Sequence, residues 1–426
     1  MKKLFEILIV VLVCFFALTA CENALGKSLT GQPDKEDGGG TTKEKQSGIS
    51  VTAYVEDDYT GIRDVYKTFY PKNGKLYIET PKYKNGAAPN TVYFYGWFLD
   101  SNYNIPLPDD YVYTQSVSVY GKWISVDGSL YKYSVNSGKA FITGFTDSSA
   151  TVIIVPAYIN SFPVIAIDSG AFKNNSVLRK VIIQEGIQSI GSSAFSGCTS
   201  LEEINIPDSV TSIGENAFQN CNNLKYNEYN NAYYLGNYNN PYMSLICAKS
   251  TDINSCTIYN FTKIISDSAF RVCHKLTGIT IPDSVTRIGE GAFAYCSGLK
   301  SVYYTGDVAG WCNISFESAE SNPLYYAHNL YINNSLVNDL VIPDTIKEIK
   351  PYAFRGCSGL TGITIPNSVT SIGESAFSGC SGLTNITYRG ITIQWQAISK
   401  GSFWKSNVPS NCEVRCTNGT INIYNA

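Results

Sequence analysis

The stretch that decides the fold of this chain is Ile279-Thr-Ile-Pro-Asp-Ser-Val-Thr-Arg-Ile-Gly-Glu-Gly-Ala-Phe-Ala-Tyr-Cys-Ser-Gly-Leu-Lys-Ser301. It contains an Ile pair, Pro, then Val-x-x-Ile-Gly, Ala-Phe, x-x-Cys and x-x-Leu. Copies of these 23 residues occupy 181–203, 204–226, 256–278, 279–301, 340–362 and 363–385, with a looser copy at about 152–180. Units of this length stack into a solenoid, because each buries its apolar face only against its neighbours.

Each repeat is predicted to contain two short strands and one turn of helix. The Ile-x-Ile run alternates as a strand does, and Pro ends its pairing because it has no N–H. Val-x-x-Ile-Gly forms a second extended piece, and Gly supports the turn that follows. Because neighbouring strands lie about 4.8 Å apart, equivalent side chains stack, and we expect the repeated phenylalanines to form a ladder in the core. The fold class is therefore mainly β, a parallel solenoid with short helical turns.

The repeat pattern Ile-Pro-Asp-Ser-Val-Thr-Ser-Ile-Gly-x-x-Ala-Phe-x-x-Cys-x-x-Leu resembles the BspA-like, or Treponema-type, leucine-rich repeat. With its caps, the resemblance covers about 127–426: a solenoid at 126–388 and a C-terminal cap at 389–426. It implies a curved solenoid on a bacterial surface. Several members of that family act as adhesins that bind fibronectin, fibrinogen or other bacterial cells. A protein ligand on host extracellular matrix or on another bacterial surface is the partner that the resemblance implies.

The first residues predict export. Lys2 and Lys3 precede an apolar run, so 1–20 is interpreted as a signal peptide. Leu18-Thr-Ala-Cys21 resembles a bacterial lipobox, which implies that Cys21 is lipidated; an ordinary secretory peptide is the alternative. Residues 21–47 contain Gly38-Gly39-Gly40 and few apolar residues, which predicts a flexible tether. The chain is then expected to be anchored by lipid to a membrane, at the outer surface of a bacterial cell.

Residues 48–125 have a different, strand-like composition. The segments Phe94-x-Gly96-Trp97-Phe98-x-Asp100 and Val119-Tyr-Gly-Lys-Trp123 resemble the Listeria–Bacteroides repeat, the B repeat of internalins. That resemblance implies a small β-grasp-like domain that serves as a spacer. Trp97 and Trp123 are interpreted as its core residues.

Two segments, 227–255 and 302–339, interrupt the array, and each is expected to hold one coil plus a protruding loop. They are rich in aromatic residues, which provide rigid contact area at protein interfaces. An alternative is that these aromatic side chains only cover an exposed edge of the solenoid. The candidate ligand contacts are Tyr229, Tyr233, Tyr234, Tyr238, Tyr303, Trp311, Tyr325 and Tyr326.

Little in the sequence indicates catalysis or metal binding. Lys and Arg number 32 and Asp and Glu 35, a net charge of −3, which does not favour nucleic acid as a partner. Only two histidines occur, and no phosphate-binding loop or calcium motif is present. The repeated cysteines lack the close pairs of tetrahedral metal sites and are interpreted as buried apolar residues. No catalytic residue, cofactor or metal is predicted, and the chain is not expected to be an enzyme.

Export permits disulfide formation outside the ladder of cysteines. Cys412 with Cys416 is the predicted pair, and Cys247 with Cys256 is a second candidate. The leading hypothesis for function is a lipid-anchored adhesin. The rival hypothesis is a structural envelope lipoprotein without a host ligand.

Overall fold

A computed structural model describes residues 128–425 continuously and, before them, 49–56, 63–71, 92–99, 114–125 and the isolated positions 76, 78, 107 and 112. The predicted signal peptide, Cys21 and the tether lie outside the described residues. None of the helices within the described ranges is long and apolar enough to cross a membrane.

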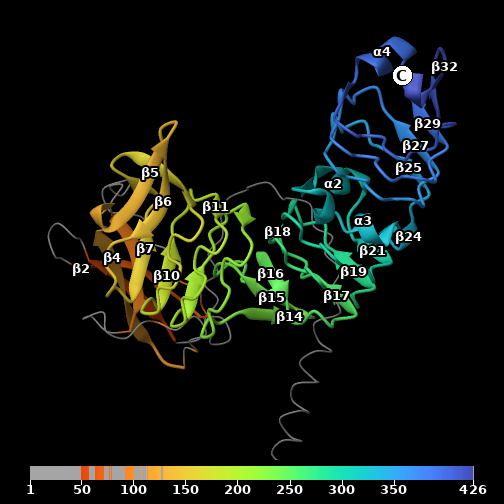
Figure 1. Cartoon of the computed structure of the whole chain (residues 1–426). Coiled ribbons are helices and arrows are strands. Elements are labelled where there is room, and N and C mark those ends of the chain that lie inside the picture. The colour runs from red at the N-terminus through yellow and green to blue at the C-terminus, as the bar shows by residue number, and fades with distance from the viewer. Residues whose placement is uncertain are drawn as a thin grey trace, which may run out of the picture. The chain divides into compact units, whose positions relative to one another are not determined.

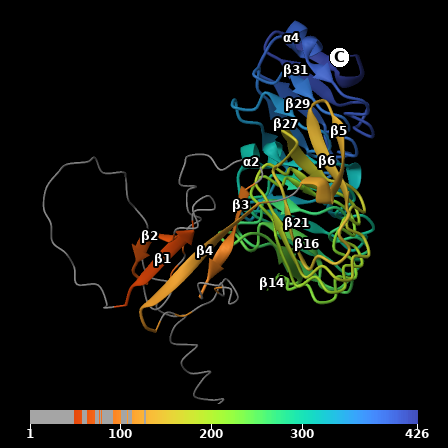
Figure 2. The same ribbon diagram turned by 90° about the vertical axis from the view of Figure 1, so that its left-hand side faces the viewer.

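A small mixed sheet comes first in the chain (Figure 2). Its strands are β1 (Val51–Glu56), β2 (Arg63–Phe69), β3 (Val92–Phe98) and β4 (Val117–Ser125). The order is β2-β1-β4-β3, with the central pair parallel and both outer pairs antiparallel, as in a β-grasp-like sheet. Val51, Ala53 and Val119 are fully buried, and Trp97 packs against them. The side chain of Trp123 is outside the described set.

The repeats form the predicted parallel solenoid (Figure 1). In each coil, a first strand carries the Ile-x-Ile pair and a second strand carries the Ile before Gly. Between regular coils, first strands pair with first strands and second strands pair with second strands. The register follows the repeat: Val181 is opposite Ile204, Ile279 opposite Val302, and Ile363 opposite Ile386.

Pairing of the first strands divides the solenoid into three stacks. Stack 1 begins with the 3₁₀ turn η1 (Gly128–Leu130) and a hairpin. Its strands are β5 (Tyr131–Asn136), β6 (Lys139–Phe145), β7 (Val152–Val155), β8 (Tyr158–Ile159), β9 (Phe162–Ile167), β10 (Lys180–Ile183), β11 (Ser189–Ile190), β12 (Glu203–Asn205) and β13 (Ser212–Ile213). Its first strands are β7, β10 and β12.

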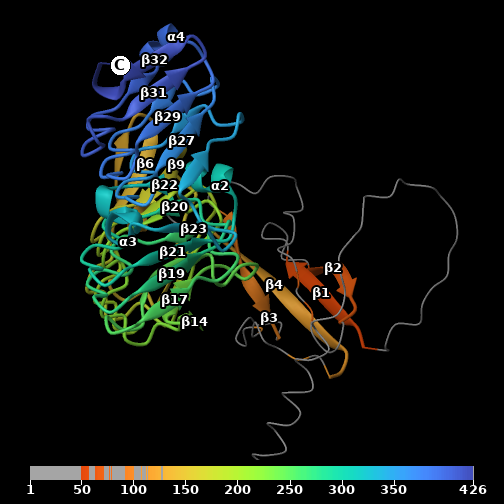
Figure 3. The ribbon, with the colours of Figure 1, turned by 90° about the vertical axis from the view of Figure 1, so that its right-hand side faces the viewer.

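Stack 2 runs from β14 to β24. Its elements are β14 (Asn227–Tyr229), β15 (Ala232–Leu235), β16 (Ser244–Ala248), β17 (Ser255–Thr257), β18 (Ile264–Ile265), β19 (Gly278–Ile281), β20 (Arg287–Ile288), β21 (Ser301–Tyr304), α2 (Val308–Asn313), β22 (Ser315–Phe316), η2 (Ala319–Ser321), α3 (Leu324–Ala327), β23 (Leu330–Ile332) and β24 (Ser335–Leu336). The first strands β17, β19, β21 and β23 lie side by side, and β24 closes the sheet (Figure 3).

Stack 3 repeats the plan of stack 2 without the opening hairpin. Its elements are β25 (Asp339–Val341), β26 (Glu348–Ile349), β27 (Gly362–Ile365), β28 (Ser371–Ile372), β29 (Asn385–Tyr388), α4 (Thr392–Ala397), β30 (Ser399–Lys400), β31 (Glu413–Cys416), β32 (Gly419–Asn422) and η3 (Ile423–Asn425).

The phenylalanine ladder is confirmed, but it is interrupted. Ring centroids of Phe172, Phe195 and Phe218 are 5.0 and 5.7 Å apart, with planes within 6° of parallel. The pairs Phe270–Phe293 and Phe354–Phe377 stack in the same way at 5.2 and 5.6 Å. The breaks between these groups coincide with the boundaries of the stacks.

The repeated cysteines are buried, as predicted, and most also donate a hydrogen bond. The Sγ atoms of Cys198, Cys221 and Cys296 lie 3.1 Å from the carbonyl oxygens of Phe172, Phe195 and Phe270. Each of these bonds joins one coil to the coil before it. Burial also raises the pKa of Cys296 and of Cys357 to about 12, so these thiols are poor nucleophiles.

The repeated Gly is required by a close contact with the preceding coil, and not by the turn that we expected it to support. A Cβ on Gly214 would lie 2.5 Å from the backbone nitrogen of Ser192, and one on Gly373 would lie 2.3 Å from that of Pro351. Close approach of the preceding coil therefore excludes a side chain. Ser266 and Lys350 occupy this position in the first coils of stacks 2 and 3, where no regular coil of the same stack precedes them.

The two interruptions differ in structure, and only the second contains a coil. Residues 227–255 form an antiparallel sheet, β14-β15-β16, whose last strand pairs with β18 and so begins stack 2. Residues 302–339 complete the last coil of stack 2, in which Val302 pairs with Leu330, and then turn back as the hairpin β23–β24. The expectation of a coil was right only for the second segment.

The C-terminal cap has the same construction as that last coil of stack 2. We call these two the closing coils. Ile386 pairs with Val414, again 28 positions apart, and the hairpin β31–β32 follows. Both coils contain Tyr-x-Gly-x4-Trp-x2-Ile-Ser. Tyr304 packs edge-on against Trp311, and Tyr388 against Trp395, each with 5.4 Å between ring centroids.

The predicted disulfide between Cys412 and Cys416 is wrong, because both are free thiols. Cys416 lies at the end of β31 and Cys412 directly before its start. Four steps along a strand cover about 13 Å, whereas the Cα atoms of a disulfide lie within about 7 Å. Cys247 and Cys256, the second candidate pair, are also free.

Candidate functional site

Two of the predicted ligand contacts belong to the core. Tyr234 and Trp311 are fully buried. The backbone nitrogen of Tyr259 donates to the Tyr234 hydroxyl at 3.4 Å, and Trp311 Nε1 donates to the carbonyl of Ala353 at 2.8 Å. Neither side chain presents surface to a ligand, so their assignment as contacts is corrected to structural residues.

The hairpin in 227–255 covers the free edge of the first-strand sheet of stack 2. The Asn230 side chain accepts from the backbone nitrogen of Thr257 at 3.1 Å, and Asn231 donates to the carbonyl of Ser255 at 2.7 Å. These bonds satisfy backbone groups of β17 that no preceding first strand reaches. Covering the edge is therefore one role of the tyrosine-rich segment.

Part of the same segment remains at the surface as an aromatic group. We call Tyr229, Tyr242, Tyr259 and Phe261 the hairpin cluster. Tyr242 and Tyr259 stack with centroids 4.2 Å apart, and Tyr229 packs edge-on against Tyr259 at 5.2 Å. Phe261 lies 5.9 Å from Tyr259 and is 65% exposed, while Tyr229 is 39% exposed. The cluster thus combines internal packing with an uncovered outer surface.

The remaining predicted tyrosines have mixed surroundings. Tyr238 is exposed, whereas Tyr233 is half-buried beneath Lys249, which forms an ion pair with Glu228. On α3, the guanidinium of Arg355 lies 5.1 Å from the ring of Tyr325. The Tyr326 hydroxyl accepts from the backbone nitrogen of Tyr295 at 2.9 Å and donates to Glu320. Burial, followed by the hydrogen bond to Glu320 and the Glu320 charge, raises the pKa of Tyr326 to about 12, although the hydrogen bond from Tyr295 acts in the opposite direction.

Tyr303 belongs to a second exposed group, on the outer face of the first-strand sheet of stack 2. Its ring stacks on that of Tyr331 with 4.9 Å between centroids. Beside them is an open cleft of about 380 Å³, which we call the tyrosine cleft; it is lined by Thr280, Tyr303, Tyr304, Thr305, Asn333 and Asn334. None of these six residues is charged.

The pattern of strands, ladders and closing coils has a counterpart among known families. The sequence model of the BspA type Leucine rich repeat region matches residues 145–244, 246–336 and 325–424. The chain belongs to the BspA-type leucine-rich-repeat family. The three matched ranges correspond approximately to the three stacks, and each stack is a leucine-rich-repeat scaffold of that type.

Solved structures of bacterial leucine-rich-repeat proteins are similar to this chain. A protein of T. pallidum is 20% identical, with 65% of this chain and 98% of that chain covered and a TM-score of 0.27. A leucine-rich cell surface protein of Faecalibacterium prausnitzii is 26% identical, with 64% and 97% covered and a TM-score of 0.30. One from Bacteroides ovatus is 24% identical, with 69% and 78% covered and a TM-score of 0.27. No curated protein matches this chain.

Within the ranges that the structure describes, no group of three or more His, Cys, Asp or Glu residues is placed to hold a metal ion. Nδ1 of His328, an exposed residue, lies 2.8 Å from the carbonyl oxygen of Gly356. Nine ion pairs are found between described residues, and each has at least one partner more than a third exposed.

Sequence reasoning did not single out several residues of these surfaces, namely Tyr242, Tyr259, Phe261, Tyr331, Asn333 and Asn334. Aligning residues 301–337 with 385–421 would have identified three of them. In that alignment Tyr331 corresponds to Arg415, and the tip of the first hairpin corresponds to that of the second. No comparable signal marks Phe261, which occupies the position of Ser284 in the next coil.

Proposed function

We propose that this BspA-type protein is an adhesin. A lipid on Cys21 would hold it at the outer surface of a bacterial cell, where the solenoid binds a protein of the host extracellular matrix or of another bacterium. The observation that supports this proposal is the hairpin cluster, an exposed aromatic surface on a scaffold whose repeated outward positions are mostly small and polar. Exposed aromatic groups of this kind are frequent hot spots of protein interfaces.

The cluster is arranged to bind with little loss of entropy. Stacking between Tyr242 and Tyr259 holds both rings in place before a ligand arrives. Asn240 donates to the carbonyl of Phe261 at 2.7 Å, which fixes the backbone beneath the most exposed ring. A surface that is already ordered contributes more of its contact energy to affinity.

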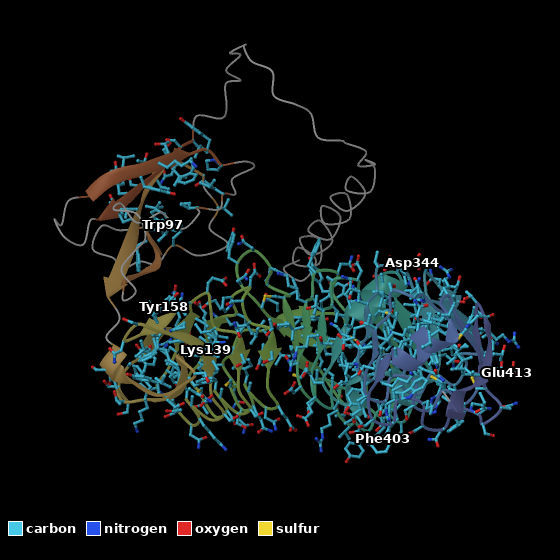
Figure 4. All side chains as sticks on the ribbon, turned by 90° about the horizontal axis from the view of Figure 1, so that it is seen from above. Trp97, Lys139, Tyr158, Asp344, Phe403 and Glu413 are labelled. Carbon is cyan, nitrogen blue, oxygen red and sulfur yellow. The ribbon has the colours of Figure 1, made fainter. Side chains whose placement is uncertain are left out.

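Binding of the full chain to immobilised fibronectin, fibrinogen and intact bacterial cells tests the proposal. The variant combines Tyr229→Ser with Phe261→Ser. Its control is Phe403→Ser in stack 3, where Phe403 is 70% exposed (Figure 4). We expect the double variant to weaken binding about tenfold or more and the control to bind as the original chain does. Equal binding by the double variant would show that the cluster is not the contact surface.

The anchor and the location need separate measurements. Cys21→Ser should move the protein from the detergent phase to the aqueous phase in a non-ionic detergent partition. Protease added to intact cells should remove the solenoid if it faces outward. Protection from protease, with no binding to any host or bacterial target, would favour the rival hypothesis of a structural envelope lipoprotein.

A further inference from the structure

We propose that the tyrosine cleft is a binding site for a neutral carbohydrate, separate from the hairpin cluster. Carbohydrates present apolar C–H faces, which pack against aromatic rings, and hydroxyl groups, which exchange hydrogen bonds with amides and hydroxyls. The cleft offers both kinds of partner within one concave surface, as small-molecule sites do.

The aromatic part of the cleft is held in place by its neighbours. Tyr303 and Tyr331 occupy equivalent positions on the paired strands β21 and β23, so their rings stack. On the preceding first strand, β19, the partner of Tyr303 is Thr280, and the position diagonal to Tyr303 is Gly278, where a Cβ would lie 3.7 Å from Tyr303 Cε2. The ring therefore lies alongside backbone, and no side chain of that residue covers it. Tyr303 is 37% exposed.

The polar part of the cleft comes from the tip of the hairpin β23–β24. Asn333 and Asn334 both adopt left-handed backbone conformations, with φ of 50° and 60°, which is the geometry of a tight two-residue hairpin turn. Both residues are exposed. The hydrogen bonds found among the described residues do not involve either side-chain amide, so each retains a donor and an acceptor for a ligand. Thr280 and Thr305 add hydroxyl groups to the same lining.

The second closing coil shows that the fold does not require this arrangement. In stack 3, Thr387 and Arg415 stand at the positions of Tyr303 and Tyr331 on equivalent paired strands. The Asn418 side chain at that hairpin tip accepts from the backbone nitrogen of Thr392 at 2.8 Å. The closing coil of stack 3 thus uses its hairpin amide in an internal hydrogen bond and lacks the stacked rings. The closing coil of stack 2 has the stacked rings and exposed amides.

The absence of charge in the lining selects the ligand class. A cleft for an acidic glycan, a phosphate or a carboxylate would present Lys or Arg, and none lines this one. The ring pair alone would also suit a protein side chain. Combined with outward amides and hydroxyls at the rim, it fits a neutral polyhydroxylated ligand better.

A glycan array that carries neutral, sialylated and sulfated oligosaccharides, probed with the full chain, tests the site. Neutral glycans that bind are then measured in solution by saturation-transfer NMR. The variants are Tyr303→Ala and the pair Asn333→Gly with Asn334→Gly, because glycine removes both amides and still adopts the left-handed conformation of the turn. Thr387→Ala, the equivalent position in stack 3, is the control. We expect each cleft variant to weaken the binding of a neutral glycan about tenfold or more, with the control unchanged.

Three results would overturn the proposal: no neutral glycan bound by the full chain, binding of acidic glycans alone, or neutral binding that the cleft variants leave intact. Because Asn333 and Asn334 are at an exposed hairpin tip, a correctly folded variant is expected even where Tyr303→Ala disturbs the sheet. Binding of the same variants to the protein panel separates the two proposals. Loss there with no glycan binding would assign Tyr303 to a protein interface.

Discussion

Truncation of one ring in the phenylalanine ladder should reveal how much stacking adds to burial. Phe195 is fully buried and stacks on a ring above and a ring below, at 5.0 and 5.7 Å. Phe218 is nearly as buried, at 4% exposure, but among the described residues it stacks on Phe195 alone. The two residues therefore form a matched pair in which the number of stacked neighbours is the main difference.

The expected costs follow from burial first and from stacking second. Replacing a core Phe by Ala costs about 3–5 kcal/mol, and an aromatic pair contributes about 0.5–1.5 kcal/mol beyond its buried area. We expect Phe218→Ala to lower the free energy of unfolding by about 3 kcal/mol and Phe195→Ala to lower it by about 1 kcal/mol more. Phe195→Leu keeps much of the volume and should cost less than either.

Urea denaturation, together with hydrogen exchange of residues 181–226, measures the loss of stability in each Phe→Ala variant. Exchange is needed because solenoids lose cooperativity between distant coils and a single unfolding free energy then averages over stacks. Opening should be fastest in the coils on either side of Phe195. Equal destabilisation by the two Ala variants would refute the stacking argument, and values under about 2 kcal/mol for both would refute the assigned register.

Three further predictions test the close contacts, the junction between stacks and the buried thiols. Gly214→Ala should destabilise stack 1 by about 1–3 kcal/mol, because its Cβ would lie 2.5 Å from a backbone atom of the preceding coil. The control is Gly278→Ala, whose Cβ would make an ordinary contact at 3.7 Å, and the urea midpoints of the two variants are compared. Asn322→Ala should cost about 1–3 kcal/mol and speed hydrogen exchange at the junction of stacks 2 and 3, because the buried amide of Asn322 donates to the carbonyls of Tyr352 and Ala353. Unchanged hydrogen exchange at the junction would contradict that role. Stability should fall as pH rises from about 9 towards 12. The thiols of Cys296 and Cys357 ionise near pH 9 in the unfolded chain, whereas burial keeps them protonated up to about pH 12 in the folded one. In a series of thermal melts at increasing pH, Cys→Ala at both positions should reduce this dependence of stability on pH.

The regular parts of this fold follow from the sequence because their signals repeat. An Ile pair, a Phe and a Cys at fixed spacing predicted the two strand columns, the ring ladder and the burial of the thiols. The division into stacks was missed because single positions mark it, such as Ser266 and Lys350 in place of Gly. Lys350 also has a role that no pattern predicts: its Nζ donates to the carbonyl of Asn313 at 2.5 Å, across the junction of stacks 2 and 3.

The candidate contacts were harder to predict because abundance of tyrosine does not determine exposure. Tyr303 and Tyr304 are neighbours on one strand, where side chains alternate between the two faces; one is 37% exposed and the other 2%. Trp311 is buried by a different cause. It lies on α2, where its ring packs edge-on against Tyr304 inside the last coil of stack 2, and its Nε1 donates to the carbonyl of Ala353 in stack 3.

The two closing coils separate the requirements of the fold from those of a ligand within one chain. The aromatic positions that are identical in both, Tyr304 with Tyr388 and Trp311 with Trp395, are buried. Two positions that differ in chemistry, Tyr303 with Thr387 and Tyr331 with Arg415, are on the outer face of the sheet. Because the same backbone tolerates Thr and Arg there, packing alone does not account for two stacked tyrosines in stack 2. Contact with something outside the chain is the simplest physical reason for keeping two aromatic rings on a face that water would otherwise cover.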